Sequence, residues 1–413
     1  MCYTQSRFKA LLSACVLSLI ATAGWSQSLT WLGTLGGRYS AASDVSADGA
    51  VVVGRAYNAA GQGRAFRWTA SGGMQDLGTL GGGSSEALGV SADGSVVVGD
   101  ARNAEGRWRA FRWTASGGMR DLGTLGGSES GALGVSADGT VVVGRAANAA
   151  GQTRAFRWTA SGVRQDLGTL PGGNESLARG VSADGSVVVG VALNGAGQWR
   201  AFRWTASGGM QDLGTLGGAS SRANGVSADG AVVVGRAANA AGQTRAFRWT
   251  ASGGMQDLGT LGGGYSQAWG VSADGSVVVG DARNAEGRWH AFRWTASGGM
   301  EDLNTTYASL LTNGSRLREA RAISPDGRYI VGWGYNAASG LSEEAFLLDT
   351  GPRCTAHNGD VDGNGCVDDA DLLAVLFAFG STGSTLGRED TNCDGTVDDA
   401  DLLQVLFNFG SGC

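Results

Sequence analysis

The chain is short of proline, lysine and histidine. Its 413 residues include three prolines and two histidines, His290 and His357, and Lys9 is the single lysine. So little proline beside 73 glycines favours tight turns over a disordered, low-complexity chain. A nucleic-acid-binding surface is excluded, because the arginines recur at regular intervals instead of clustering.

Long apolar runs are also missing, which predicts a protein without a transmembrane span. The apolar run at residues 10–21 follows a basic segment and ends beside a small-residue cleavage pattern at Ala23. These features predict an export signal over residues 1–23 and a secreted or cell-surface protein. Lipidation at Cys15 stays open as a second interpretation, because Cys15 follows Leu-Ser-Ala.

What the chain has in abundance is one stretch, Ser-Ala-Asp-Gly-Ser-Val-Val-Val-Gly, which begins at Ser91. Six further copies begin at Ser46, Ser136, Ser182, Ser227, Ser272 and, in degenerate form, Ser324. The spacings are 45, 45, 46, 45, 45 and 52 residues. A fixed period of this size indicates a solenoid, a propeller or an array of small units.

Each unit divides into four short extended segments and shows no sustained helical periodicity. In one unit the predicted strands are Ala87–Ser91, Val96–Gly99, Arg109–Thr114 and Met119–Leu125. An Asp-Gly pair after the first strand supplies the positive φ angle that a tight turn needs. Four antiparallel strands per 45 residues are typical of a propeller blade.

The two ends of the repeat region complement each other. Leu29–Leu35 is a fourth-strand sequence with no unit before it, and the seventh unit stops after its third strand, Glu344–Leu348. Pairing these two segments would close a ring and remove the exposed edges. An open solenoid would need capping units, and none is visible. The sequence therefore predicts an all-β, monomeric seven-bladed propeller over residues 28–351.

The units resemble HAF repeats, which are extracellular repeats named for a His-Ala-Phe triplet beside a Leu-Gly-Thr-Leu-Gly-Gly segment. The triplet is His290-Ala291-Phe292 in one unit, and Arg-Ala-Phe replaces it in five others. The resemblance covers about residues 29–350 and implies an exported repeat protein. The Ser-Pro-Asp-Gly at Ser324 also resembles the first hairpin of WD-repeat propellers.

Residues that recur in every unit are interpreted as structural. The repeated Trp, such as Trp113, is expected in the core between blades, and the Asp before Gly is expected to form a turn. The Arg before each Phe is expected to pair with the Asp of Asp-Leu-Gly, as in Arg109 with Asp121.

The variable loops after the second and fourth strands should share one rim of the ring. Exposed aromatic side chains surrounded by polar groups favour contact with a protein or a sugar. We therefore expect a protein or carbohydrate ligand at Trp108, Trp199, Trp269 and Trp289. Drift in loops without function is the alternative.

The last sixty residues differ in kind, since residues 354–413 carry eleven acidic side chains and one basic side chain, Arg388. Two loops space oxygen atoms as a calcium-binding loop does, with Gly at its sixth position. The predicted ligands in the first loop are Asp360, Asp362, Asn364, the carbonyl of Cys366, Asp368 and Asp371. Those in the second are Asp390, Asn392, Asp394, the carbonyl of Thr396, Asp398 and Asp401. Oxygen ligands of this kind suit two Ca²⁺ ions better than zinc.

Each loop leads into one apolar helix, expected at Leu372–Gly380 and Leu402–Gly410. Duplicated loop–helix halves, with Asp at the twelfth loop position, resemble a type I dockerin within residues 352–413. The resemblance implies calcium-dependent folding and docking onto a cohesin-type protein receptor through the helix faces. Asp369-Ala370 and Asp399-Ala400 stand where dockerins often carry the residue pairs that recognise the receptor.

Four of the six cysteines lie in this module, and an even set in an exported protein predicts two disulfides. Of the three possible pairings we favour Cys354–Cys413 together with Cys366–Cys393. The first pair would join the ends of the module, and the second would join its two loops.

No catalytic residue is predicted, because no pair of carboxylates stands apart from the repeat pattern. The chain is therefore expected to be a secreted, non-catalytic interaction or scaffold protein. The alternatives are a dockerin-bearing polysaccharide-active enzyme, a lectin-like propeller that binds carbohydrate, and a purely structural matrix protein.

Overall fold

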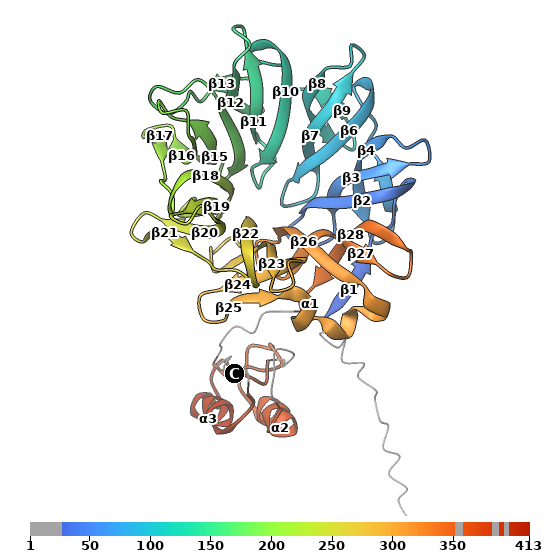
Figure 1. Cartoon of the computed structure of the whole chain (residues 1–413). Helices are drawn as coiled ribbons and strands as arrows, with labels where there is room; N and C mark the ends of the chain where they lie inside the picture. Colours follow the sequence, from blue (N-terminus) through green and yellow to red (C-terminus); the bar gives the residue numbers. More distant parts are fainter. Residues whose placement is uncertain (1–26, 352–357, 382–387, 392–395) are drawn as a thin grey trace, which may run out of the picture. The chain divides into compact units, whose positions relative to one another are not determined.

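The computed structural model describes residues 27–351, 358–381, 388–391 and 396–413 (Figure 1). They fall into two compact units, one within Gln27–Arg353 and one within Cys354–Cys413. The predicted export signal, including Cys15, lies outside the described residues. Among the residues that are described, no helix has the length and apolar character needed to cross a membrane.

The first unit is a ring of seven four-stranded antiparallel sheets, which confirms the predicted propeller (Figure 1). The first strands of the blades are β2 (Gly36–Val45), β6 (Gly81–Val90), β10 (Gly126–Val135), β14 (Ser176–Val181), β18 (Gly217–Val226), β22 (Gly262–Val271) and β26 (Arg316–Ile323). The second strands are β3 (Val52–Asn58), β7 (Val96–Asn103), β11 (Val141–Asn148), β15 (Val187–Leu193), β19 (Val232–Asn239), β23 (Val277–Asn284) and β27 (Tyr329–Asn336). The third strands are β4 (Gly63–Thr69), β8 (Trp108–Thr114), β12 (Thr153–Thr159), β16 (Trp199–Thr205), β20 (Thr244–Thr250), β24 (Trp289–Thr295) and β28 (Leu341–Asp349). The fourth strands are β5 (Gly73–Asp76), β9 (Gly118–Asp121), β13 (Arg164–Asp166), β17 (Gly209–Asp212), β21 (Gly254–Asp257), β25 (Gly299–Asp302) and β1 (Ser28–Trp31).

The Asp-Gly turn of each repeat is held by its own side chains. Ser91 Oγ donates to Asp93 Oδ1 at 2.6 Å and accepts from Val96 N at 2.9 Å, while Gly94 takes a φ of +70°. The Ser91 hydroxyl and the Ser95 amide lower the pKa of Asp93 to about 2. This Asp is a turn former, as the repeat pattern predicts.

The hydrophobic core lies between neighbouring blades. Val51 and Val53 pack with Val97, Phe111 and Trp113 of the next blade, while Val52 faces the opposite side. Valine runs therefore form strands that are covered on both faces. The repeated tryptophans at 68, 113, 204, 249 and 294 are buried as predicted, and Trp158 is partly exposed.

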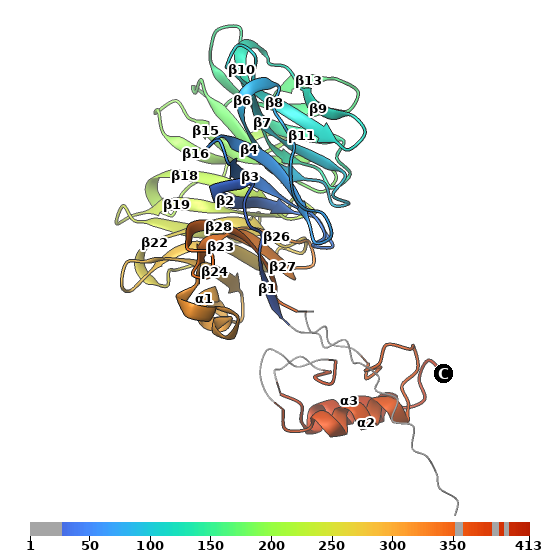
Figure 2. The same ribbon diagram turned by 90° about the vertical axis from the view of Figure 1, so that its right-hand side faces the viewer.

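The ring closes as predicted, by pairing of β1 with β28 (Figure 2). Their register runs from Ser28 opposite Asp349 to Trp31 opposite Phe346. At this junction the buried Ser40 hydroxyl accepts from Ala345 N at 2.9 Å. The equivalent serine accepts the same hydrogen bond at each successive junction from that between blades one and two to that between blades five and six.

Two segments differ from the predicted strands. Leu122–Leu125, predicted as the end of a strand, lies outside β9 and links two blades, because Asp121 caps Gly123 N at 2.7 Å and Gly123 has a φ of +78°. The copies that begin at Ser272 and Ser324 are 52 residues apart, and the extra residues between them form α1 (Leu303–Thr306), η1 (Ala308–Leu310) and η2 (Thr312–Gly314). Buried Leu303 and Tyr307 attach this insertion to the last blade.

The C-terminal unit contains two helices that lie side by side, α2 (Asp369–Ala378) and α3 (Asp399–Asn408) (Figures 1 and 2). Each begins with a capping box, in which Asp368 or Asp398 is the N-cap. The described core is a small group of valines, Val361, Val367, Val375, Val397 and Val405. A core of this size contributes much less than the inter-blade cores of the propeller.

Candidate functional site

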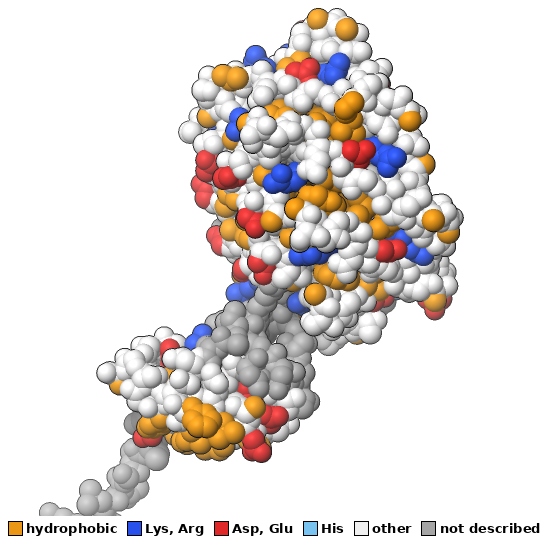
Figure 3. Space-filling view, turned by 90° about the vertical axis from the view of Figure 1, so that its left-hand side faces the viewer, with side chains coloured by type: hydrophobic (Ala, Val, Ile, Leu, Met, Phe, Trp, Pro, Cys, Tyr) orange, Lys and Arg blue, Asp and Glu red, His pale blue; other side chains and the backbone are white. Residues whose placement is uncertain are grey.

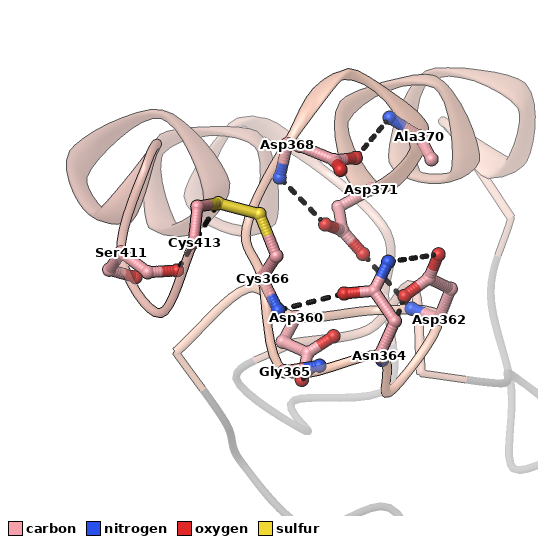
Figure 4. The surroundings of a disulfide bond; sticks show 10 residues. All are labelled: Asp360, Asp362, Asn364, Gly365, Cys366, Asp368, Ala370, Asp371, Ser411 and Cys413. Atoms are coloured by element: carbon pink, nitrogen blue, oxygen red, sulfur yellow. Dashed lines mark hydrogen bonds between the residues drawn. A yellow bond between two sulfur atoms is a disulfide. The ribbon is translucent and has the colours of Figure 1, made fainter.

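The first acidic loop gathers three of its predicted ligands (Figure 4). One carboxylate oxygen each from Asp360, Asp362 and Asp371 lies within 4.8 Å of the others. Oxygen ligands at roughly 2.3–2.6 Å from one Ca²⁺ ion lie no more than about 5 Å apart. The cluster therefore fits a calcium ion, because the spacing is right and all three ligands are hard oxygens.

The loop backbone is shaped around the buried Asp371. Its carboxylate accepts from Val361 N at 2.6 Å, Asp362 N at 3.0 Å and Asp368 N at 2.9 Å. Asn364 Oδ1 accepts from Cys366 N at 2.7 Å. Asp368, a predicted ligand, accepts from Ala370 N at 2.8 Å and caps α2 instead of joining the cluster (Figure 4).

The second loop repeats the described part of this arrangement. Asp401 is buried and accepts from Thr391 N at 2.6 Å and Asp398 N at 3.0 Å. Asp398 caps α3 through Ala400 N. Asp390 and Thr396 are also described, whereas the predicted ligands Asn392 and Asp394 lie outside the described residues.

The disulfide prediction is wrong for Cys366 and Cys413, which are bonded to each other with 4.7 Å between their Cα atoms (Figure 4). The reason is a backbone pairing that the sequence does not reveal. Val367 N donates to Ser411 O at 3.0 Å, and Gly410 N donates to Val367 O at 2.8 Å. The end of the chain therefore returns to the first loop. The other two cysteines, Cys354 and Cys393, lie outside the described residues.

The C-terminal unit also exposes a large apolar surface, visible as a patch of hydrophobic side chains in Figure 3. We call it the apolar face; it consists of Leu373, Leu376, Phe377, Phe379, Leu403, Leu406, Phe407 and Phe409. Phe377 is 88% exposed and Phe407 is 83% exposed. Because the two helices contribute equivalent residues, the face is duplicated like the loops.

The four predicted rim tryptophans lie on two kinds of strand. Trp108, Trp199 and Trp289 begin the third strands of alternate blades, and two of them lie under arginines, Arg102 and Arg283, at 4.9 and 4.8 Å. Trp289 also meets Tyr265 edge to face. Trp269 lies in β22, away from the third strands.

Trp269 belongs to a ring of side chains that the sequence did not reveal. Each first strand contains a β-bulge directly after a buried alanine, and at this bulge one residue of the strand has no partner in the ladder. We call these residues the bulge ring: Ser43, Leu88, Leu133, Arg179, Asn224, Trp269 and Arg321. All seven line one cavity of about 260 Å³. Bulges often re-aim side chains next to functional sites.

The residues of the bulge ring vary within an otherwise regular repeat, and this variation is a signal in the sequence that the prediction from the repeat did not use. Flanking positions are nearly constant, with Gly at the next position in five of the seven blades. Asp44 replaces that Gly in the first blade and accepts from Val45 N and Val90 N, both at 2.9 Å. Burial raises the pKa of Asp44 to about 6.

No protein-family model and no curated protein matches the chain. Solved propellers do match it. TolB from Acinetobacter baumannii is 14% identical, with 70% of this chain and 76% of that chain covered and a TM-score of 0.44. The β-propeller domain of the Trilobed protease from Pyrococcus furiosus is 11% identical, with 75% of this chain and 96% of that chain covered and a TM-score of 0.48. A puromycin hydrolase is 17% identical, with 78% of this chain and 54% of that chain covered and a TM-score of 0.49. At this identity the likeness concerns the fold alone.

Proposed function

We propose that this protein is an exported, non-catalytic interaction protein whose C-terminal unit docks onto a protein receptor. The observation that carries the proposal is the duplicated apolar face on α2 and α3. Among the described residues, the only other large apolar side chain that is exposed is Val163 on the propeller. A contiguous apolar patch with polar surroundings marks an interaction surface.

The side chains of the apolar face are not part of the hydrophobic core of the unit. The described core of the unit is made of valines, and these are fully buried or nearly so. The larger Leu and Phe side chains are exposed at the surface of the unit, so burying them requires a surface outside it, and we propose that a receptor supplies that surface. A helix face of this kind fits an apolar surface on a folded receptor, and the dockerin-like pattern favours a cohesin-type receptor.

Calcium is proposed to complete the unit. Asp360, Asp362 and Asp371 would hold one ion in the first loop, and Asp390 and Asp401 would contribute to a second. The bound ions would neutralise the gathered carboxylates. Because these loops position the start of each helix, loss of calcium is expected to disorder the apolar face.

The test is capture of binding partners from the host's secreted and envelope fractions by the full-length chain, with calcium or with EDTA. Phe377→Asp/Phe407→Asp replaces the two most exposed side chains of the apolar face with charges. Val163→Asp is the matched control, because it makes the same kind of change at an exposed apolar position outside the unit.

We expect one defined protein to be retained in calcium by the wild type and by V163D. The double variant and EDTA should both lose it, and calorimetry with the purified partner should show at least a tenfold weaker affinity for the double variant. Equal retention by wild type and double variant would refute docking through this face. Titration of the metal-free chain with calcium alone, followed by calorimetry, tests the two proposed calcium sites apart from receptor docking.

A further inference from the structure

The propeller contains a second candidate binding site, which is independent of docking by the C-terminal unit. The bulge ring surrounds a cavity of about 260 Å³, which has room for a small ligand. Neighbouring first strands approach closely there, since a Cβ added to Gly134 would lie 3.0 Å from the carbonyl oxygen of Arg179. The backbone therefore fixes the ring, and the bulge side chains decide what the cavity accepts.

Two arginines, Arg179 and Arg321, line this cavity. The positive charges that act on Arg179 of β14 are those of Arg222 and Arg236 of the next blade, Arg321 of the last blade and Arg145 of the blade before. Burial, and then these four arginines, lower the pKa of Arg179 to about 9. In the part of the chain that the structure describes, neither Arg179 nor Arg222 forms an ion pair, and the buried Nε of Arg179 has no hydrogen-bond partner.

The carboxylates of the same region are engaged elsewhere. Glu86 pairs with Arg55 at 3.9 Å, and Asp100 pairs with Arg145 at 3.5 Å. Glu319 pairs with Arg321, and Asp281 accepts from Trp269 Nε1 at 2.6 Å. Asp44 is held by backbone amides of its own blade and the next. Among the described residues, no carboxylate therefore forms an ion pair with Arg179.

A free acceptor lies on the neighbouring blade. Asn224 is buried and donates through Nδ2 to Ala268 O at 2.7 Å, while its Oδ1 has no hydrogen-bond partner. A guanidinium whose buried Nε lacks a hydrogen-bond partner and a buried amide oxygen without a donor both cost free energy. A ligand that carries an acidic oxygen and a hydroxyl group would satisfy the two together.

From this arrangement we propose that the central cavity binds a small hydroxylated organic anion, such as a sugar acid. Its carboxylate would accept from Arg179, and a hydroxyl would donate to Asn224 Oδ1, since both residues line the cavity. Arginine suits this role because its planar fork binds a carboxylate through two parallel hydrogen bonds. The Trp269 ring, with Arg321 4.0 Å above its centre, would form a neighbouring wall.

The test is calorimetry and thermal unfolding of the full chain with glucuronate, galacturonate, gluconate and glycerate, and with glucose and inorganic phosphate as comparison probes. Arg179→Gln removes the unpaired charge and keeps much of the side-chain length. Arg109→Gln is the matched control, because Arg109 pairs with Asp121 at 2.9 Å on the third and fourth strands of a blade.

We expect at least one sugar acid to bind the wild type and R109Q, to raise their unfolding temperature, and to bind R179Q at least about tenfold more weakly. The ligand-free R179Q protein should unfold no earlier than the wild type, since it loses an uncompensated charge, so a folding defect cannot mimic the result. Binding of none of the four acids, or equal binding by R179Q, would overturn the proposal. Phosphate binding as tight as that of the best acid would overturn the role of the hydroxyl group.

Discussion

The two units of this chain solve the problem of stability in opposite ways. The propeller buries aromatic and valine side chains between every pair of blades and closes its sheet edges with β1. The C-terminal unit buries five valines, leaves its phenylalanines exposed, and gathers carboxylates in its loops. The difference indicates that the propeller has the larger core of the two units, whereas the small core of the C-terminal unit is supplemented by a cross-link and, under the proposal above, by metal ions and a partner.

The strongest test of this comparison is one substitution made in both units. Phe111→Ala in the propeller removes a fully buried ring and should cost about 3–5 kcal/mol of unfolding free energy. Phe377→Ala removes a ring that is 88% exposed and should change the unfolding free energy by no more than about 0.5 kcal/mol. Denaturant unfolding of the full chain measures both, and similar losses would show that the apolar face is buried in solution.

A second test concerns the cross-link. Cys413→Ser removes the bond to Cys366, which spans a sequence separation of 47 residues, and should destabilise the C-terminal unit by about 2–4 kcal/mol. Hydrogen exchange of the full chain should then show faster exchange in α2 and α3. Exchange in the propeller strands should stay unchanged, and serves as the internal control. Unaltered hydrogen exchange in α2 and α3 would mean that the small valine core keeps the two helices folded without the disulfide.

A third test concerns the pKa of a carboxyl group in the propeller. Asp44 in the propeller has a folded pKa of about 6, above its ordinary value of 3.8. It therefore contributes stability that is complete below pH ~4 and is lost as the pH rises through about 6. Asp44→Asn removes this dependence.

The difference in unfolding free energy between wild type and D44N should consequently shift in favour of D44N by up to about 3 kcal/mol between pH 4 and pH 7. Thermal and denaturant unfolding of the propeller at several pH values measures this difference. Taking the difference cancels the titration of all other groups. A constant difference across this range would place Asp44 in contact with solvent.

The sequence predicted those features that depend on repetition. The 45-residue period, the complementary ends and the pairing of Arg109 with Asp121 all follow from comparing copies of the same unit. His290 takes the place of this arginine and lies 2.5 Å from Asp302, so the same contact survives the substitution. Repetition is informative because a residue that recurs in register must occupy the same environment each time.

Features that depend on pairing between distant segments were not predicted. A β-bulge is a mismatch in register, so the role of Asn224 or Trp269 in the ring is not visible until the second strand is placed beside the first. The bond between Cys366 and Cys413 likewise depends on how the last residues pair with Val367. Four cysteines allow three pairings, and their spacing does not choose among them.

The serine contact at the blade junctions has a consequence for how such a protein changes over generations. The contact that joins neighbouring blades inside the chain also joins the last blade to the first, through Ser40 and Ala345. The blades that share this contact therefore offer their neighbours the same attachment, and near-identical coding repeats are prone to unequal recombination. Gain or loss of one such repeat would add or remove a junction of the same kind and would change the number of bulge residues around the cavity. If the cavity binds the proposed ligand, one genetic step of this kind would change what it accepts.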